Sequence, residues 1–193
     1  IFDVARIGRS ISEDRCIEAV RSLAARLGVG DAALEAAIAV PAPSAAKPGE
    51  GRTCLLGGNP PPDDRLHRVI AAAGWQAQGK TQAESWFGEC DAAQVGTGDP
   101  CAALGKRLHT SQSGVRSFAD RGAGLVERAR TCGADAAILW FSEEDEAEVW
   151  NLPAQRRALE AEGLPVLVLT RRDWRANDGA PQEIAAFLKG LGA

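Results

Sequence analysis

The sequence predicts an α/β protein: a parallel sheet of about four strands with helices on both faces, preceded by a helical hairpin. Strand-sized apolar runs alternate with helix-sized segments from residue 53 to the end of the chain. The last two of these runs are apolar almost throughout, as in strands that are covered on both faces. Loops rich in Gly, Pro and Asp separate the segments, as at the ends of strands and helices.

The first 39 residues are expected to form a helical arm. Ser10 precedes Glu13 by the spacing of a capping box, and apolar residues then recur at helical intervals until Gly28. Asp31 is placed to cap a second, short helix. Two helices joined through a glycine turn make the predicted helical hairpin.

Residues 40–52, VPAPSAAKPGEGR, are rich in Pro and Gly and lack apolar periodicity, which is typical of a linker. A domain boundary is therefore predicted here. Residues 53–193 are assigned to a single flavodoxin-like (Rossmann-like) α/β domain, and the rhythm of its segments favours the strand order 2-1-3-4.

The expected elements of this domain alternate between strand and helix. They are a strand at 53–58, a helix beginning at Pro62 and Asp63, a weak strand at 75–78, a helix capped by Asp99, a helix ending at Gly133, a strand at 134–141, a helix capped by Asn151 and ending at Gly163, a strand at 164–170, and a helix at 180–192.

Charge and composition exclude several classes of protein. The net charge is −4, and no basic stripe is interleaved with aromatic residues, so no nucleic acid partner is expected. The longest apolar runs are strand-sized, so no membrane span is expected. The cysteines form no C-x-x-C pair, which argues against zinc, and their odd number and scattered positions indicate reduced thiols and a cytoplasmic location. They are Cys16, Cys54, Cys90, Cys101 and Cys132.

Ligands of open parallel sheets bind beyond the carboxyl ends of the strands, near the point where the strand order reverses. The expected order places that point between the first and third strands, where loops 57–64 and 142–150 meet beside loop 170–179. The predicted ligand-binding residues are Gly57, Gly58, Asn59, Arg171, Arg172 and Trp174.

Each of these loops also has a plainer interpretation. The two glycines can admit a ligand close to the backbone, but the loop is neither a dinucleotide fingerprint nor a P-loop, and an ordinary strand-to-helix turn remains open. Arg171 and Arg172 can bind phosphate or carboxylate, and Trp174 can stack on adenine, which would suit a coenzyme A ester. Surface ion pairing of the arginines remains the alternative.

The loop after the third strand carries five carboxylates within six positions. Because like charges repel, such a cluster of carboxylates indicates either a cation site or a solvated loop, in which Arg171 and Arg172 neutralise part of the charge. The glycine that a tight calcium loop needs is absent. The five acidic residues are Glu143, Glu144, Asp145, Glu146 and Glu148.

Three stretches carry a resemblance to a known family: FDVAR with the helical arm, TCLLGGNPPPDDRLHRVIAAAGW, and the segment from CGADAAILWF to APQEIAAFLKGL. Together they resemble the 2-hydroxyacyl-CoA dehydratase component family, which includes benzoyl-CoA reductase subunits. The likeness is best over Gly133–Leu169. It implies flavodoxin-like domains with a helical part, related subunits that pair, an acyl-CoA ligand, a [4Fe-4S] cluster on cysteines, and an ATP-dependent activator that supplies electrons for radical dehydration (a lyase reaction) or ring reduction.

Two departures from the family concern the cluster. Gln82 and Asp145 stand near the positions where the resemblance places cluster cysteines, and Cys90 lies a few residues too late. Thiolates are the ligands that cluster iron prefers, so no cofactor is expected in this chain itself. The family's first domain has no counterpart, which leaves a fragment and a shortened relative as interpretations. The expected function is a cluster-free subunit of such a complex, paired with a related subunit. The alternative is a non-catalytic interaction or small-ligand-binding protein that keeps the fold.

Overall fold

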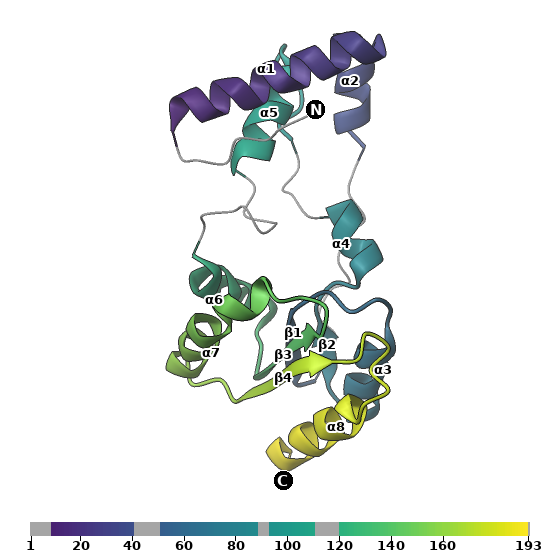
Figure 1. Ribbon diagram of the computed structural model, residues 1–193, viewed down its shortest axis with the longest axis vertical. Coiled ribbons are helices and arrows are strands. Elements are labelled where there is room, and N and C mark those ends of the chain that lie inside the picture. The colour runs from purple at the N-terminus through teal and green to yellow at the C-terminus, as the bar shows by residue number, and fades with distance from the viewer. Residues whose placement is uncertain (1–8, 41–50, 89–92, 111–119, 193) are drawn as a thin grey trace. The chain divides into compact units, whose positions relative to one another are not determined.

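The computed structural model describes residues 9–40, 51–88, 93–110 and 120–192 (Figure 1). The chain divides into two compact units. The helical unit comprises residues 1–44 and 87–119, and the α/β unit comprises residues 45–86 and 120–193. Each unit is therefore built from two stretches of chain that are separated by a stretch of the other.

The α/β unit contains a four-stranded, entirely parallel sheet in the order β2-β1-β3-β4, which confirms the predicted order. The strands are β1 Thr53–Gly58, β2 Gln76–Gln78, β3 Ala136–Ser142 and β4 Val166–Arg172. All seven residues of β3 are buried, which explains why this segment is apolar at nearly every position.

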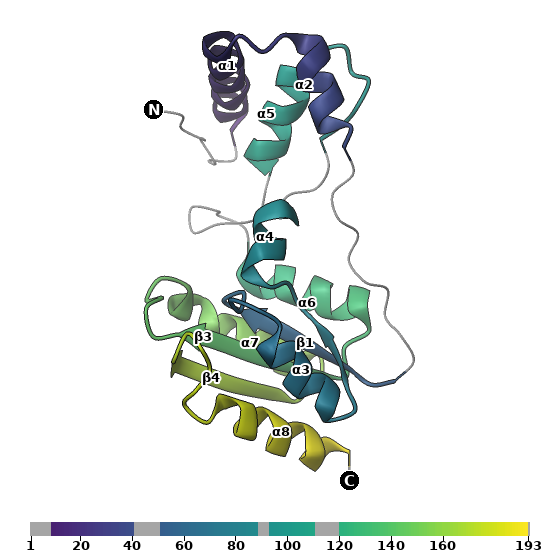
Figure 2. The same ribbon diagram turned by 90° about the vertical axis from the view of Figure 1, so that its right-hand side faces the viewer.

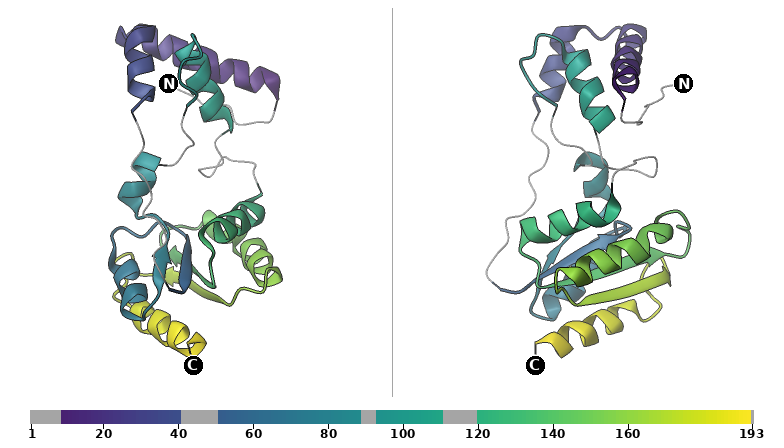
Figure 3. Two further views of the ribbon diagram at one scale, coloured as in Figure 1. Left: turned by 180° about the vertical axis from the view of Figure 1, so that it is seen from behind. Right: turned by 90° about the vertical axis from the view of Figure 1, so that its left-hand side faces the viewer.

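Helices cover both faces of the sheet (Figure 3). Helices α3 (Arg65–Ala72) and α8 (Ala180–Leu191) pack on one face, in a core cluster that includes Ile138 and Trp140. Helices α6 (Arg121–Cys132) and α7 (Leu152–Ala161) pack on the other, around Leu139 and Phe141. The side chains of successive β3 residues thus pack into the cores on opposite faces of the sheet, because side chains alternate along a strand.

The end of β1 passes very close to β3. Gly58 has φ +85°, and a Cβ added there would lie 3.0 Å from the backbone nitrogen and carbonyl carbon of Trp140 and would collide with its carbonyl oxygen. A Cβ on Gly57 would lie 3.0 Å from a methyl group of Leu139 and 3.2 Å from one of Leu125. Both glycines therefore have a packing reason that is independent of any ligand.

The helical unit consists of α1 (Ser10–Leu27), α2 (Asp31–Ile38) and α5 (Pro100–Thr110). Helix α5 packs against α1 and α2 (Figure 2). The contact with α1 is close because α5 contributes Gly105, whose added Cβ would lie 2.6 Å from the Cα of Ile17. Gly28 ends α1 in the left-handed conformation, so the predicted hairpin turn is confirmed.

The units differ from the predicted domain limits. Residues 53–193 were expected to form one domain, whereas residues 87–119 group with the N-terminal helices. Gly105 leaves room on α5 for the backbone of Ile17 in α1, which explains the close packing of these two helices. Most of the predicted linker at 40–52 lies outside the described residues.

Several predicted helix caps are wrong. Helices α1 and α2 begin after Arg9 and Gly30, so Ser10 and Asp31 lie inside the first turns, and neither helix has a side-chain cap. Asn151 makes no side-chain cap bond, because the 3₁₀ helix η1 (Glu148–Asn151) already runs into α7.

Other helix boundaries agree with the sequence. Asp99 does cap α5, because its carboxylate accepts a hydrogen bond from the Ala102 nitrogen at 2.9 Å. Gly133 ends α6 in the left-handed conformation, as predicted. Helix α4 (Gln82–Gly88) lies in a stretch for which no helix was predicted. Within the described ranges, none of the helices combines the length and apolarity needed to cross a bilayer.

Candidate functional site

Asn59, the first residue after β1, joins the loops at the carboxyl edge of the sheet. Its backbone nitrogen donates to the Trp140 carbonyl at 2.8 Å, and its Oδ1 accepts from the Ser142 nitrogen at 2.8 Å. Its Nδ2 donates to a carboxylate oxygen of Asp145. The predicted meeting of the loops after β1 and β3 is thus made through one amide side chain.

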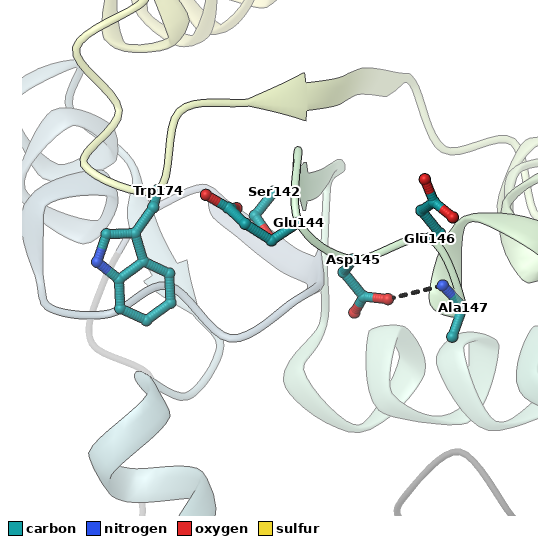
Figure 4. A pocket seen from close by; sticks show the side chains of 6 residues that line it. All are labelled: Ser142, Glu144, Asp145, Glu146, Ala147 and Trp174. Carbon is teal, nitrogen blue, oxygen red and sulfur yellow. Dashed lines mark hydrogen bonds between the residues drawn. The ribbon is translucent and has the colours of Figure 1, made fainter.

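Asp145 is the centre of the acidic loop. Besides the bond from Asn59, its carboxylate accepts hydrogen bonds from the backbone nitrogens of Ala147 at 2.9 Å and Glu148 at 3.1 Å (Figure 4). These bonds close a turn between Asp145 and the start of η1. Asp145 stands where the resemblance expects a cluster cysteine, and here its side chain holds the loop together.

A pocket of about 640 Å³ lies between the acidic loop and the loop after β4. Trp174 stands on one side, Asp145 and Glu146 on the other, with Ser142 and Glu144 between them (Figure 4). The pocket is wide open to solvent, so it is a surface depression and not an enclosed cavity. Among the described residues, three carboxylates line the pocket and no basic side chain does, so the pocket favours a cation over an anion.

The last two residues of β4, Arg171 and Arg172, make different pairs. Arg171 forms the expected ion pair with the acidic loop, 3.2 Å from Glu143. Arg172 instead pairs with Glu183 of α8 at 2.8 Å and lies 3.9 Å from Asp178, so its predicted pairing with the acidic loop is wrong. The register shift between β3 and β4 at this point accounts for the difference, since Ser142 lies opposite Arg172.

Two carboxylates that follow the strands have lowered pKa values. Burial raises the pKa of Asp178, but hydrogen bonds from backbone nitrogens and the charge of Arg172 outweigh it. The backbone nitrogen of Arg65, followed by its guanidinium, lowers the pKa of Asp63. Both carboxylates are therefore ionised near neutral pH and are engaged within the protein.

The loop after β2 leads into Gln82, the second position that the resemblance equates with a cluster cysteine. Gln82 begins α4, and its backbone nitrogen donates to the Pro61 carbonyl at 2.8 Å. The adjacent Thr81 donates from its nitrogen and its hydroxyl to Glu84, both at 2.8 Å, which lowers the pKa of Glu84. The loops after β2 and β3 are thus each tied to the loop after β1.

The described cysteines are free thiols: Cys16, Cys54, Cys101 and Cys132. Burial, followed by the nearby Cys132, raises the pKa of Cys54 to about 12, so its thiol is protonated and serves as a packing group. Cys90 lies outside the described residues. Among the residues that are described, no group of three or more His, Cys, Asp or Glu side chains is placed to hold a metal ion.

One residue of this edge had no predicted role. Trp150 lies in η1, just beyond the acidic loop, with 85% of its surface exposed. The signal in the sequence is a tryptophan that directly follows an acidic run and lies outside the apolar period of the next helix. Exposure itself could not be read from that pattern.

The fold and this edge define the class of protein: a parallel α/β protein with the strand order 2-1-3-4 and an acidic pocket with a tryptophan wall at its carboxyl edge. A scan against protein-family models and a search of the curated proteins find no match. The resemblance to acyl-CoA dehydratase components therefore rests on the sequence pattern alone.

The network around Asn59 gives a first testable prediction. Asn59→Ala and Asp145→Ala are each expected to lower the free energy of unfolding by about 1–3 kcal/mol, because each leaves half-buried partners without hydrogen bonds. The double variant should lose less than the sum, with a coupling of roughly 1 kcal/mol. Urea denaturation followed by tryptophan fluorescence measures all three.

Glu146→Ala is the matched control, since Glu146 is an exposed neighbour in the same loop. We expect a change of no more than about 0.5 kcal/mol for it. Strictly additive losses in the double variant would contradict a shared network.

Proposed function

We propose that this chain is a supporting subunit, without an iron–sulfur cluster of its own, of an acyl-CoA dehydratase or reductase complex of the type that 2-hydroxyacyl-CoA dehydratase components form. The observation that carries the proposal is that Asp145, at a position where the resemblance expects a cluster cysteine, holds its own loop together. Its carboxylate is committed to Asn59 and to the backbone nitrogens of Ala147 and Glu148. Carboxylate oxygens are poor substitutes for the thiolates that cluster iron prefers.

Two exposed side chains, one at the end of β4 and one just after it, support an acyl-CoA ligand. Trp174 is 40% exposed and can stack on an adenine ring. The ion pair of Arg171 with Glu143 is solvent-exposed on both sides, so it contributes little and Arg171 can turn to a phosphate. In such a complex the partner would be a related, cysteine-bearing subunit, and an ATP-dependent activator would supply the electron.

Two measurements test this proposal. Anaerobic purification should give a protein with far less iron and acid-labile sulfide than one cluster requires. Isothermal titration with butyryl-CoA should show binding that Trp174→Ala and Arg171→Ala each weaken by about tenfold. Arg157→Ala, which removes an exposed arginine from α7, is the control and should leave the affinity unchanged. Stoichiometric iron would refute the cluster-free assignment, and absent binding would refute the acyl-CoA assignment.

A second function is favoured by the pocket itself: a non-catalytic interaction or small-ligand-binding protein that keeps the fold. The carboxylates of Glu144, Asp145 and Glu146 repel the phosphates of coenzyme A from this pocket. The same titration separates the two functions, because only the first requires an acyl-CoA to bind.

A further inference from the structure

Trp150 is the most exposed large apolar side chain in the part of the chain that the structure describes, at 85%. Exposing an indole to water is unfavourable, and tryptophan is among the residues most enriched at the energetic centres of protein interfaces. Trp174, 40% exposed, lines the pocket together with Glu144 and Glu146. The acidic loop is thus followed along the chain by one exposed indole and lines a pocket with another.

The acidic residues between them are unequally neutralised. Glu143 pairs with Arg171 at 3.2 Å, and Glu148 lies 3.6 Å from Arg121. Asp145 is held by hydrogen bonds within its own loop and from Asn59. Among the described ion pairs, none neutralises the two remaining carboxylates, which are exposed and line the pocket beside Trp174; these belong to Glu144 and Glu146.

We propose that this acidic–tryptophan surface, formed by Glu144, Glu146, Trp150 and Trp174, docks a basic segment of a partner protein. An arginine or lysine of the partner enters the pocket, where carboxylates and the face of Trp174 complement its charge. Trp150 anchors an adjacent apolar part of the same segment.

The position of Trp150 favours a protein segment, and not a small cation, as the ligand of this surface. Trp150 does not line the pocket; it lies in η1, beyond the acidic loop. A small cation held by Trp174, Glu144 and Glu146 would leave Trp150 in water. A chain segment can fill the pocket with one side chain and cover Trp150 with another. The inference rests on the proposed function only for the existence of a protein partner, and it adds the face and its chemistry.

Fluorescence anisotropy with a labelled peptide of alternating arginine and leucine tests this surface. Trp150→Ala and the double variant Glu144→Gln/Glu146→Gln are each expected to weaken binding by about tenfold. Two controls in the helical unit remove an exposed apolar side chain and two carboxylate charges: Leu27→Ala, where Leu27 is 68% exposed, and the double variant Asp14→Asn/Glu18→Gln on the exposed side of α1. Both controls should change the affinity less than about twofold.

Each other outcome overturns the proposal. Equal weakening by Asp14→Asn/Glu18→Gln would mean that the peptide responds to net charge alone. Arginine amide that displaces the peptide at the peptide's own concentration would mean a small-cation site. The docking surface would be refuted if the peptide did not bind, or if Trp150→Ala left its affinity unchanged. Circular dichroism of each variant confirms folding. A failed butyryl-CoA or iron test leaves these outcomes unaffected, so the two proposals fail separately.

Discussion

Gly58→Ala is expected to lower the free energy of unfolding of the α/β unit by about 3 kcal/mol or more. Two costs combine at this position. Gly58 has φ +85°, a conformation that side chains with a Cβ rarely adopt. The added methyl group would also collide with the backbone of Trp140, to which β1 is paired. Backbone atoms cannot rotate away as a side chain can, so β1 and β3 must separate at their carboxyl ends.

Gly163→Ala is the control that separates these two costs. Gly163 has φ +77° but nothing within 4 Å of an added Cβ, so only the backbone strain applies, at about 1 kcal/mol. Urea denaturation of both variants, followed by tryptophan fluorescence, gives the difference that belongs to the collision. Equal losses in the two variants would show that β1 and β3 accommodate the methyl group.

Gly105→Ala should destabilise the helical unit by about 2–3 kcal/mol, because the added Cβ would lie 2.6 Å from the Cα and 2.8 Å from the nitrogen of Ile17. Helix propensity alone predicts the opposite sign, since alanine favours a helix over glycine by about 1 kcal/mol. A loss of stability would therefore report the close approach of α5 to α1. Gly190→Ala in α8, with open space around its Cβ, should instead be neutral or stabilising.

The two units can be followed separately in this experiment. All five tryptophans lie in the chain ranges of the α/β unit, whereas circular dichroism reports the helices of both units. For Gly105→Ala, the helical signal should be lost at lower urea while the fluorescence transition stays in place. A fluorescence transition that moves by the same amount would contradict the separate loss of the helical unit.

The sheet was predictable because burial dictates its composition. A strand covered on both faces, such as Ala136–Ser142, has to be apolar on both sides, and that leaves a continuous run in the sequence. The strand order was favoured by the alternation of segments but not determined by it, since right-handed crossovers permit a few arrangements, and the structure has the favoured one. The edge at which the loops meet then followed from the strand order.

The partner of α5 was not predictable in the same way. The pattern of a helix indicates that one face is buried, but not against which element. Gly105 matters because its backbone lies against Ile17 of α1, and this contact joins two distant stretches of chain. The bond between Asn59 and Asp145 has the same character, because it joins residues 86 positions apart. The exposure of Trp150 is likewise set by what surrounds it.

Because the two units alternate along the chain, neither is synthesised as one continuous stretch. Helices α1 and α2 leave the ribosome well before α5, so their contact face has no partner until synthesis has passed Thr110. By then β1 and β2 have also emerged, and they wait in turn for β3 and β4. The helical unit can be completed once α5 has emerged, whereas the α/β unit stays incomplete until β3, β4 and α8 have followed. Between the synthesis of β2 and that of α5, both units are incomplete at once and expose apolar surface that the finished protein buries, which favours aggregation of the nascent chain at that stage.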